Sequence, residues 1–212
     1  MKLCGVAIAG DALYVADTWN GRVQGYTLAG VFRASAGELY GPRGIAVAPD
    51  GRVWVTDVGN HRVVSYDELL QDRQIVGHKG SGAGEFSSPV GIAAAPNGEI
   101  FVADTGNKRI QRFSPEGAYR GEFPFPGWGE NVEPHLAIDR DGVIWATDPA
   151  ANSIVALDAT GKLVKRIGAD GAGNRFQNPT GIAVDRKNRI LYVVNSGSAS
   201  VSRVSLAERR MP

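Results

Sequence analysis

The sequence predicts an all-β fold, a β-propeller built from five four-stranded antiparallel units. Three observations predict it: a polar turn motif recurs along the chain, apolar residues recur at fixed places around each copy, and no window shows a sustained helical period. Sheets that cannot bury their apolar faces alone pack against their neighbours, and radial packing of such sheets makes a propeller. The 212 residues are predicted to form one domain, with units at about 1–37, 38–84, 85–130, 131–174 and 175–212.

The repeat is clearest in the turn motif itself. VADTWNGRV, VTDVGNHRV and VADTGNKRI spell nearly the same turn three times, and two weaker copies follow. In D-x-x-N-x-R we expect the Asp and Asn side chains to bond backbone groups of the turn and the Arg to fold back onto the Asp. A structural role is favoured over a catalytic one, because a catalytic site needs unlike groups to converge. One column, with Asn in the last unit, marks all five copies: Asp17, Asp57, Asp104, Asp148 and Asn195.

Apolar residues at fixed distances from this column mark the strands of each unit. A small-residue run such as GIAVAPDG or GIAAAPNG predicts an innermost strand that converges on the propeller axis. Runs after the turn predict a third strand in every unit and a fourth strand in the first four, so unit five runs out after its third strand. An aromatic residue stands three places before the acidic column in every unit: Tyr14, Trp54, Phe101, Trp145 and Tyr192.

These residues resemble the NHL repeat. The resemblance rests on the series P-x-G-I-A-x-x-P-D/N-G, then V/A-A/T-D-x-x-N-x-R-V/I, then an aromatic-ended third strand, and it covers essentially the whole chain. Units two and three fit closely. Unit four has Leu136 in place of the Gly, and units four and five lose the Arg of the turn. The resemblance implies a propeller that usually has six blades and that serves as a binding scaffold.

The two ends of the chain leave the closure of the ring undecided. The chain begins in the innermost strand of unit one, and neither end offers a surplus strand that would close the ring. An open ring would expose two apolar blade faces. Three arrangements could cover them: a closed five-bladed ring, an incomplete six-bladed ring that belongs to a longer protein, or self-association of two chains through their open edges.

The amino-acid composition limits the classes of binding partner. Hydrophobic residues at 43% and charged residues at 21% are typical of a globular domain, and a net charge of +1 leaves no basic excess to neutralise a phosphate backbone, so nucleic acid is an unlikely partner. No run of the sequence predicts membrane insertion. Cys4 is the single cysteine, which excludes an internal disulfide. The compartment stays open: cytoplasmic if Met1 is the natural start, extracytoplasmic if the chain is part of a longer bacterial protein.

Candidate binding residues lie on the face that carries the connecting loops and the repeated turns, because loops on a rigid scaffold are where recognition is expected. The residue after each inner-strand Pro should line the channel mouth. This column varies from unit to unit, which either a specific site or neutral drift would explain. Its members are Arg43, Val90, His135 and Thr180, with Cys4 in unit one. Around the mouth we expect Trp19, Arg22, Tyr40, His61, Arg62, Lys108, Arg109 and Trp128.

Two tryptophans are the leading candidates for interface anchors. Trp19 takes a turn position held by Gly in units two and three, so we expect it to be exposed, whereas Trp128 lies in a Pro-rich loop. An equally good interpretation is that Trp128 covers an edge of the neighbouring blade. The sequence thus favours a non-enzymatic scaffold for a protein or peptide, with this candidate contact surface: Trp19, Arg43, His61, Lys108, Trp128 and His135.

Two other classes of function remain as alternatives, because the resemblance includes a metal-using peptide-amidating lyase, related hydrolases, and RNA-binding domains. A channel metal site needs several His ligands to converge, but His61, His78 and His135 occupy different places in their repeats, so no metal or other cofactor is predicted. A calcium site built from carboxylates stays open, but the inner strands supply few acids beyond Asp139 and Asp185, which resemble turn residues. An RNA-binding face could use the arginines of the repeated turns, which the neighbouring Asp residues are expected to neutralise.

Overall fold

The computed structural model describes residues 3–128, 132–168 and 176–206. Its strands form five antiparallel sheets, called blades one to five, in which consecutive strands are neighbours. Blade one comprises β1 (Leu3–Ala9), β2 (Ala12–Asp17), β3 (Arg22–Thr27) and β4 (Phe32–Ala36). Blade two comprises β5 (Pro42–Val47), β6 (Val53–Asp57), β7 (Arg62–Tyr66) and β8 (Gln74–Val76). Blade three comprises β9 (Pro89–Ala94), β10 (Ile100–Asp104), β11 (Arg109–Phe113) and β12 (Tyr119–Pro124). Blade four comprises β13 (Leu136–Ile138), β14 (Ile144–Asp148), β15 (Ser153–Leu157) and β16 (Leu163–Ile167). Blade five comprises β17 (Pro179–Asp185), β18 (Ile190–Asn195) and β19 (Ser200–Ser205).

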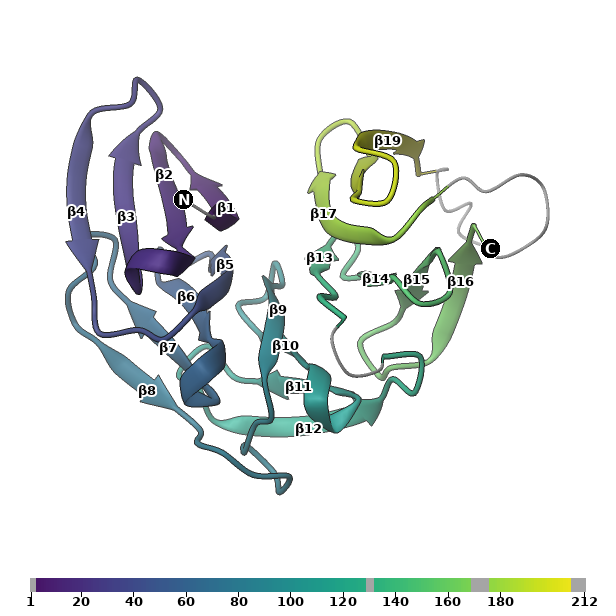
Figure 1. Ribbon diagram of the computed structural model, residues 1–212, viewed down its shortest axis with the longest axis horizontal. Coiled ribbons are helices and arrows are strands. Elements are labelled where there is room, and N and C mark those ends of the chain that lie inside the picture. The colour runs from purple at the N-terminus through teal and green to yellow at the C-terminus, as the bar shows by residue number, and fades with distance from the viewer. Residues whose placement is uncertain (1–2, 129–131, 169–175, 207–212) are drawn as a thin grey trace.

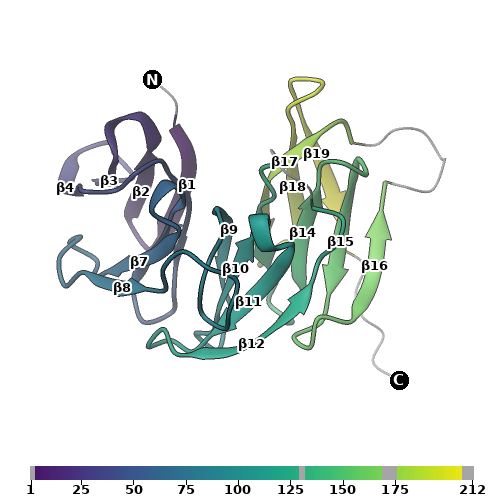
Figure 2. The same cartoon turned by 60° about the horizontal axis from the view of Figure 1, so that its bottom comes forward.

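The blades stand around a central axis with the first strand of each innermost, which confirms the predicted β-propeller of five antiparallel units (Figure 1, Figure 2). Blades one to four have four strands, and blade five has three within the described residues. The ring is open on one side, between β1 of blade one and β17 of blade five (Figure 1). The second strands of blades two, three and four are buried along their whole length, because a neighbouring blade covers each face.

The core is divided into four apolar clusters, one at each junction between consecutive blades. In blades one to four the aromatic column supplies a large side chain that faces the following blade: Tyr14, Trp54, Phe101 and Trp145. Tyr14 packs with Val53 of blade two, and Trp54 packs with Ile92 of blade three. Among the residues that the structure describes, no apolar cluster joins blade five to blade one.

The hairpin between the third and fourth strands of a blade covers the edge of the preceding blade. Tyr14 donates its hydroxyl hydrogen bond to the backbone oxygen of Glu68, 2.8 Å away in the hairpin of blade two. In blade four, Gly161 (φ 83°) lies so close to blade three that a Cβ would stand 2.2 Å from Cγ of Phe123. Glycine is required there for two reasons, the left-handed backbone and the close contact.

Gly161→Ala should therefore destabilise the protein more than Gly30→Ala. Gly30 has the same place in the hairpin of blade one and nearly the same φ (82°), but no atom lies within 4 Å of its ideal Cβ. Both changes cost about 1 kcal/mol for a left-handed alanine, and the contact with Phe123 adds roughly 1–3 kcal/mol at Gly161. Urea denaturation of both variants measures the difference, and equal losses would contradict the packing argument.

Candidate functional site

Each of the first three D-x-x-N-x-R motifs forms one turn of 3-10 helix: η1 (Thr18–Asn20), η2 (Val58–Asn60) and η3 (Thr105–Asn107). The carboxylate of Asp104 accepts hydrogen bonds from Asn107 Nδ2 at 2.8 Å and from Arg109 Nε at 2.8 Å. The Arg therefore folds back onto the Asp as predicted. The Asn amide, however, binds the carboxylate, where a bond to the turn backbone was expected, because the buried carboxylate needs more donors than the Arg supplies.

The same arrangement recurs in units one and two. Arg22 and Arg62 bind Asp17 and Asp57 with Nε to Oδ2 distances of 2.8 and 2.7 Å, and both Asp side chains are fully buried. Burial alone would raise the pKa of Asp17, but hydrogen bonds from Asn20 and Arg22 hold that pKa below its ordinary value. The Asp17 carboxylate therefore stays charged and paired.

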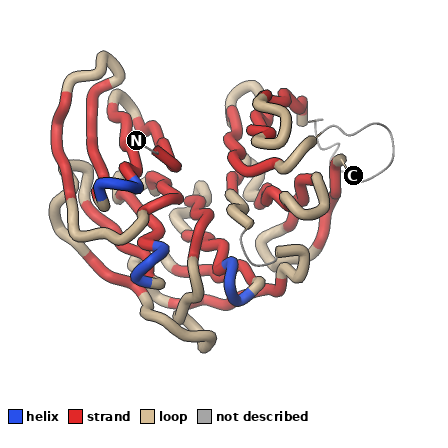
Figure 3. The backbone as a smooth tube through the Cα atoms, in the orientation of Figure 1, coloured by secondary structure: helices blue, strands red, loops and turns tan. Residues whose placement is uncertain are grey.

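The turn also fastens the loop that arrives from the preceding blade. Asp57 Oδ1 accepts the backbone N–H of Tyr40 at 2.6 Å, and the Gly59 N–H donates to the Tyr40 carbonyl at 2.8 Å. Ser87 makes the same two bonds to Asp104 and Gly106, and Gln177 makes them to Asn195 and Gly197. We call this pair of bonds the loop clip. The copies in units two, three and five each hold one loop in this way, which explains why the motif repeats. The three 3-10 turns are drawn in blue in Figure 3.

The loop clip explains the exposure of Trp19. A Cβ at Gly59 would stand 2.2 Å from the Tyr40 ring, so glycine is needed wherever a loop crosses the turn. Trp19 occupies the corresponding place in η1, and no loop of the described residues is clipped there. Its side chain is 73% exposed, in agreement with its turn position.

An aromatic cleft of about 410 Å³ lies between η1 and the loop that enters blade two. Two large exposed rings line it, Trp19 and Tyr40, the latter 69% exposed. Leu39 is buried beside them, and its N–H donates to the Gly21 carbonyl at 3.0 Å. The cleft is lined by Thr18, Trp19, Asn20, Gly21, Leu39, Tyr40 and Gly41.

Trp128 has a different position from the one expected for a surface anchor. It is completely buried, its ring stacks on Phe125 with centroids 4.2 Å apart, and its Nε1 donates to the Thr147 carbonyl at 3.0 Å. The alternative interpretation is the one that holds: Trp128 covers the edge of blade four. The prediction that Trp128 is an exposed anchor is therefore wrong, because its loop folds inward at the junction of blades three and four.

Two of the residues predicted to line the channel mouth, Arg43 and His135, lie close together. Arg43 of blade two forms an ion pair with Glu133 beside His135 of blade four. Burial, and secondarily the charge of Arg43, lower the pKa of His135 to about 4, so its imidazole is neutral at pH 7. Thr180 accepts a hydrogen bond through its carbonyl from Thr147 Oγ1 at 3.2 Å. The side chain of Cys4 lies outside the described part of the structure.

His61 and Lys108 end the second and third 3-10 turns in the left-handed conformation, with φ of 53° and 54°. Nδ1 of His61 accepts the backbone N–H of Ser88 at 3.0 Å, which fixes its ring on the neighbouring loop. The Lys108 carbonyl accepts the N–H of Phe125, while its side chain stays exposed. Both residues have structural roles on the loop face, which the sequence alone did not indicate.

Other polar groups on and near this face are paired with one another. Arg109 Nε binds Asp104, and its remaining nitrogens bind Glu122 and three backbone carbonyls of the loop 77–87. Within the described residues no three His, Cys, Asp or Glu side chains gather as a metal ion requires. The helices of that part of the chain are too short and too polar to span a membrane.

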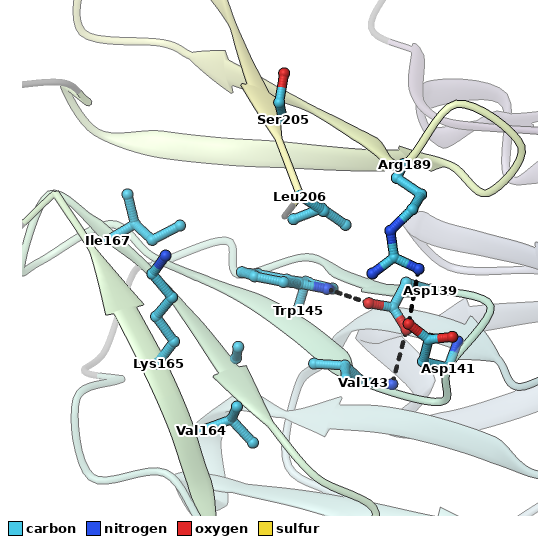
Figure 4. A pocket seen from close by; sticks show the side chains of 11 residues that line it. Asp139, Asp141, Val143, Trp145, Val164, Lys165, Ile167, Arg189, Ser205 and Leu206 are labelled. Carbon is cyan, nitrogen blue, oxygen red and sulfur yellow. Dashed lines mark hydrogen bonds and ion pairs between the residues drawn. The ribbon is translucent and has the colours of Figure 1, made fainter. Parts of the chain in front are cut away.

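A second cavity, of about 210 Å³, lies between blades four and five (Figure 4). Asp139 accepts Trp145 Nε1 at 3.1 Å and the backbone N–H groups of Asp141 and Val143, and Arg189 binds Asp141 at 2.8 Å. Asp139 is thus a turn residue, as the sequence indicated. Its bonds organise the turn before β14 and make this cavity a structural feature of the junction.

The fold and the site define a β-propeller whose loops are clipped to a repeated turn and whose loop face carries an aromatic cleft. The NHL repeat model matches residues 39–66 and 86–113, which are the blades that fit the repeat most closely. The chain is thus a β-propeller that carries NHL repeats in blades two and three.

Solved structures share this fold at low sequence identity. A streptogramin B lyase structure is 17% identical over 98% of this chain and 70% of that chain, with a TM-score of 0.70. A catalytically inactive virginiamycin B lyase from Staphylococcus aureus with Quinupristin is 16% identical over 99% and 71%, with a TM-score of 0.72. A nidogen/laminin complex gives 18% over 96% and 76%, with a TM-score of 0.75. No curated protein sequence matches the chain. These neighbours include an enzyme and a protein complex, so the likeness shows the fold alone.

The lowered pKa of His135 predicts a pH-dependent stability. Between pH 6.5 and about 4 the unfolded chain binds a proton at His135 and the folded chain does not, so the free energy of unfolding falls as the pH falls. The part due to His135 is up to about 3 kcal/mol. His135→Gln removes this contribution. The free energy of unfolding of the wild type minus that of the variant should therefore fall by up to about 3 kcal/mol between pH 7 and pH 4. A constant difference in urea denaturation would show that His135 titrates normally.

Proposed function

We propose that this propeller is a non-enzymatic binding scaffold that recognises a protein or peptide through its loop face, with the aromatic cleft as the anchor site. The observation that carries the proposal is the exposure of two large aromatic rings, Trp19 at 73% and Tyr40 at 69%, on one cleft. Tryptophan and tyrosine are enriched among the residues that dominate binding energy at protein interfaces.

The cleft is held rigidly, which favours binding. Trp19 stands on a turn whose ends are fixed by Asp17, Asn20 and Arg22. The backbone of Tyr40 is held on both sides by the loop clip, and its ring packs against Gly59. A site whose rings are already positioned loses less conformational entropy when a partner binds.

Polar residues surround the cleft as the rim of an interface does. Arg22 is 41% exposed in its side chain, and Glu38 is 84% exposed and pairs with Arg73 at 2.6 Å. In this proposal the cleft accepts one or two apolar or aromatic side chains of the partner, and the rim bonds its polar groups.

The contact surface extends from the cleft over the same face. We include Arg43 and His135 at the channel mouth, and His61 and Lys108 at the neighbouring turns, because the loops and turns that carry them meet on the loop face. Trp128 is left out because it is buried. A channel-metal lyase or hydrolase is not favoured, since the described residues offer no convergent set of metal ligands.

Replacing Trp19 should weaken binding strongly without loss of stability. A phage-displayed peptide library panned against the immobilised chain should enrich peptides that bind the wild type, and Trp19→Ala should weaken them by roughly tenfold or more. The free energy of unfolding of Trp19→Ala should stay within about 0.5 kcal/mol of the wild-type value, because the Trp19 side chain is exposed.

The matched control is Phe32→Ala, which removes another exposed aromatic ring from outer strand β4. This variant should bind the enriched peptides like the wild type. Equal binding by Trp19→Ala, or a panning experiment that enriches nothing, would refute the anchor role of the cleft.

A further inference from the structure

The aromatic cleft between η1 and the loop that enters blade two presents two separate flat faces. Trp19 is 73% and Tyr40 is 69% exposed, and neither ring packs on another aromatic ring among the described residues. Leu39 is buried beside them, and the glycines Gly21 and Gly41 add no side chain to the lining. The cleft can therefore accept a narrow apolar group against each ring.

Backbone groups on both sides of the cleft are already hydrogen-bonded within the protein. The Gly21 N–H donates to the Thr18 carbonyl at 3.4 Å, and the Leu39 N–H donates to the Gly21 carbonyl at 3.0 Å. The Tyr40 N–H donates to Asp57 Oδ1 at 2.6 Å, and the Tyr40 carbonyl accepts an N–H of η2. A peptide that binds by adding a β-strand needs free N–H and C=O groups along one edge, so strand addition does not suit this cleft.

Two polar atoms of the rings themselves remain for a ligand. Trp19 Nε1 and the Tyr40 hydroxyl make no hydrogen bond to any residue that the structure describes. The indole N–H is a donor only, and the tyrosine hydroxyl can donate as well. The cleft thus combines flat apolar surfaces with hydrogen-bond donors at their edges. It suits a ligand backbone that is rich in carbonyl groups and poor in N–H groups.

The charged side chains beside the cleft are paired with one another. Three ion pairs have N to O distances of 2.8, 2.7 and 2.6 Å: Arg22–Asp17, Arg62–Asp57 and Arg73–Glu38. Each guanidinium is balanced by one carboxylate, so these pairs carry no excess charge that would attract a cation or an anion. The ligand group that fits between them is uncharged.

We propose that the cleft recognises a proline-rich segment of its partner in the polyproline II conformation. This inference rests on the proposed function and narrows the class of partner. Proline is uncharged, its ring packs in aromatic-lined grooves, and it has no backbone N–H, so its backbone only accepts hydrogen bonds. Polyproline II has three residues per turn, so two prolines three places apart lie on the same side and can contact the two rings. The segment is extended before it binds and loses little conformational entropy in the rigid cleft.

The test compares two phage-displayed peptide libraries panned against the immobilised full chain. In the first library two prolines are fixed three places apart and the other positions are random, whereas the second has the same length and contains no proline. The first library should yield at least about tenfold more bound phage. Trp19→Ala should weaken the enriched peptides by roughly tenfold or more. Trp19→Phe, which keeps a flat ring but removes the N–H, should weaken them by roughly three- to tenfold.

The control is Phe32→Ala, which should bind the proline-containing peptides like the wild type because Phe32 lies on outer strand β4. Enrichment from the proline-free library alone, lost in Trp19→Ala, would overturn the assignment of proline while supporting the cleft as a peptide site. No enrichment from either library would overturn both. Equal binding by Trp19→Phe and the wild type would also overturn the inference, because the donor at the ring edge is what favours proline over other apolar residues.

Discussion

The loop face of this propeller depends on a buried carboxylate with two roles. One oxygen of Asp57 or Asp104 is held by the Asn and Arg of its own turn, and the other holds the N–H of a loop from the preceding blade. Removing one partner of such a buried charge typically costs 3–5 kcal/mol, because the remaining charge has no water to solvate it. The positions of the loops, the need for glycine in the turn and the exposure of Trp19 all depend on this arrangement.

The clip also connects the scaffold to its proposed function. Loops that carry recognition residues are usually the mobile parts of a protein, and ordering them reduces affinity. Here the loop backbone at Tyr40 is bonded on both sides, so the aromatic cleft is formed before any partner arrives. The rigid frame that stabilises the blades thus prepares the binding face.

The sequence predicted those features that repeat or that are local. The strands follow from columns aligned over five units, and the exposure of Trp19 follows from its position in one turn. The second bond of the carboxylate was not predicted, because its donor, the N–H of Tyr40, is a backbone group 17 residues away that no particular side chain marks in the sequence. Trp128 could be read in two ways, since a tryptophan in a Pro-rich loop can be an anchor or a cover and only packing decides. The opening between β1 and β17 is seen only in the arrangement of the blades (Figure 1).

The division of the core into four separate junctions has a consequence for how the molecule unfolds. In a closed ring every blade has two neighbours, and losing one blade breaks two junctions. Across the described residues the blades form a linear series, so blades one and five each have a single junction there. Such a series follows nearest-neighbour cooperativity, in which the ends fray before the centre. Blade three, with two blades on each side, is the centre of this series, while the aromatic cleft lies at the first junction, between blades one and two.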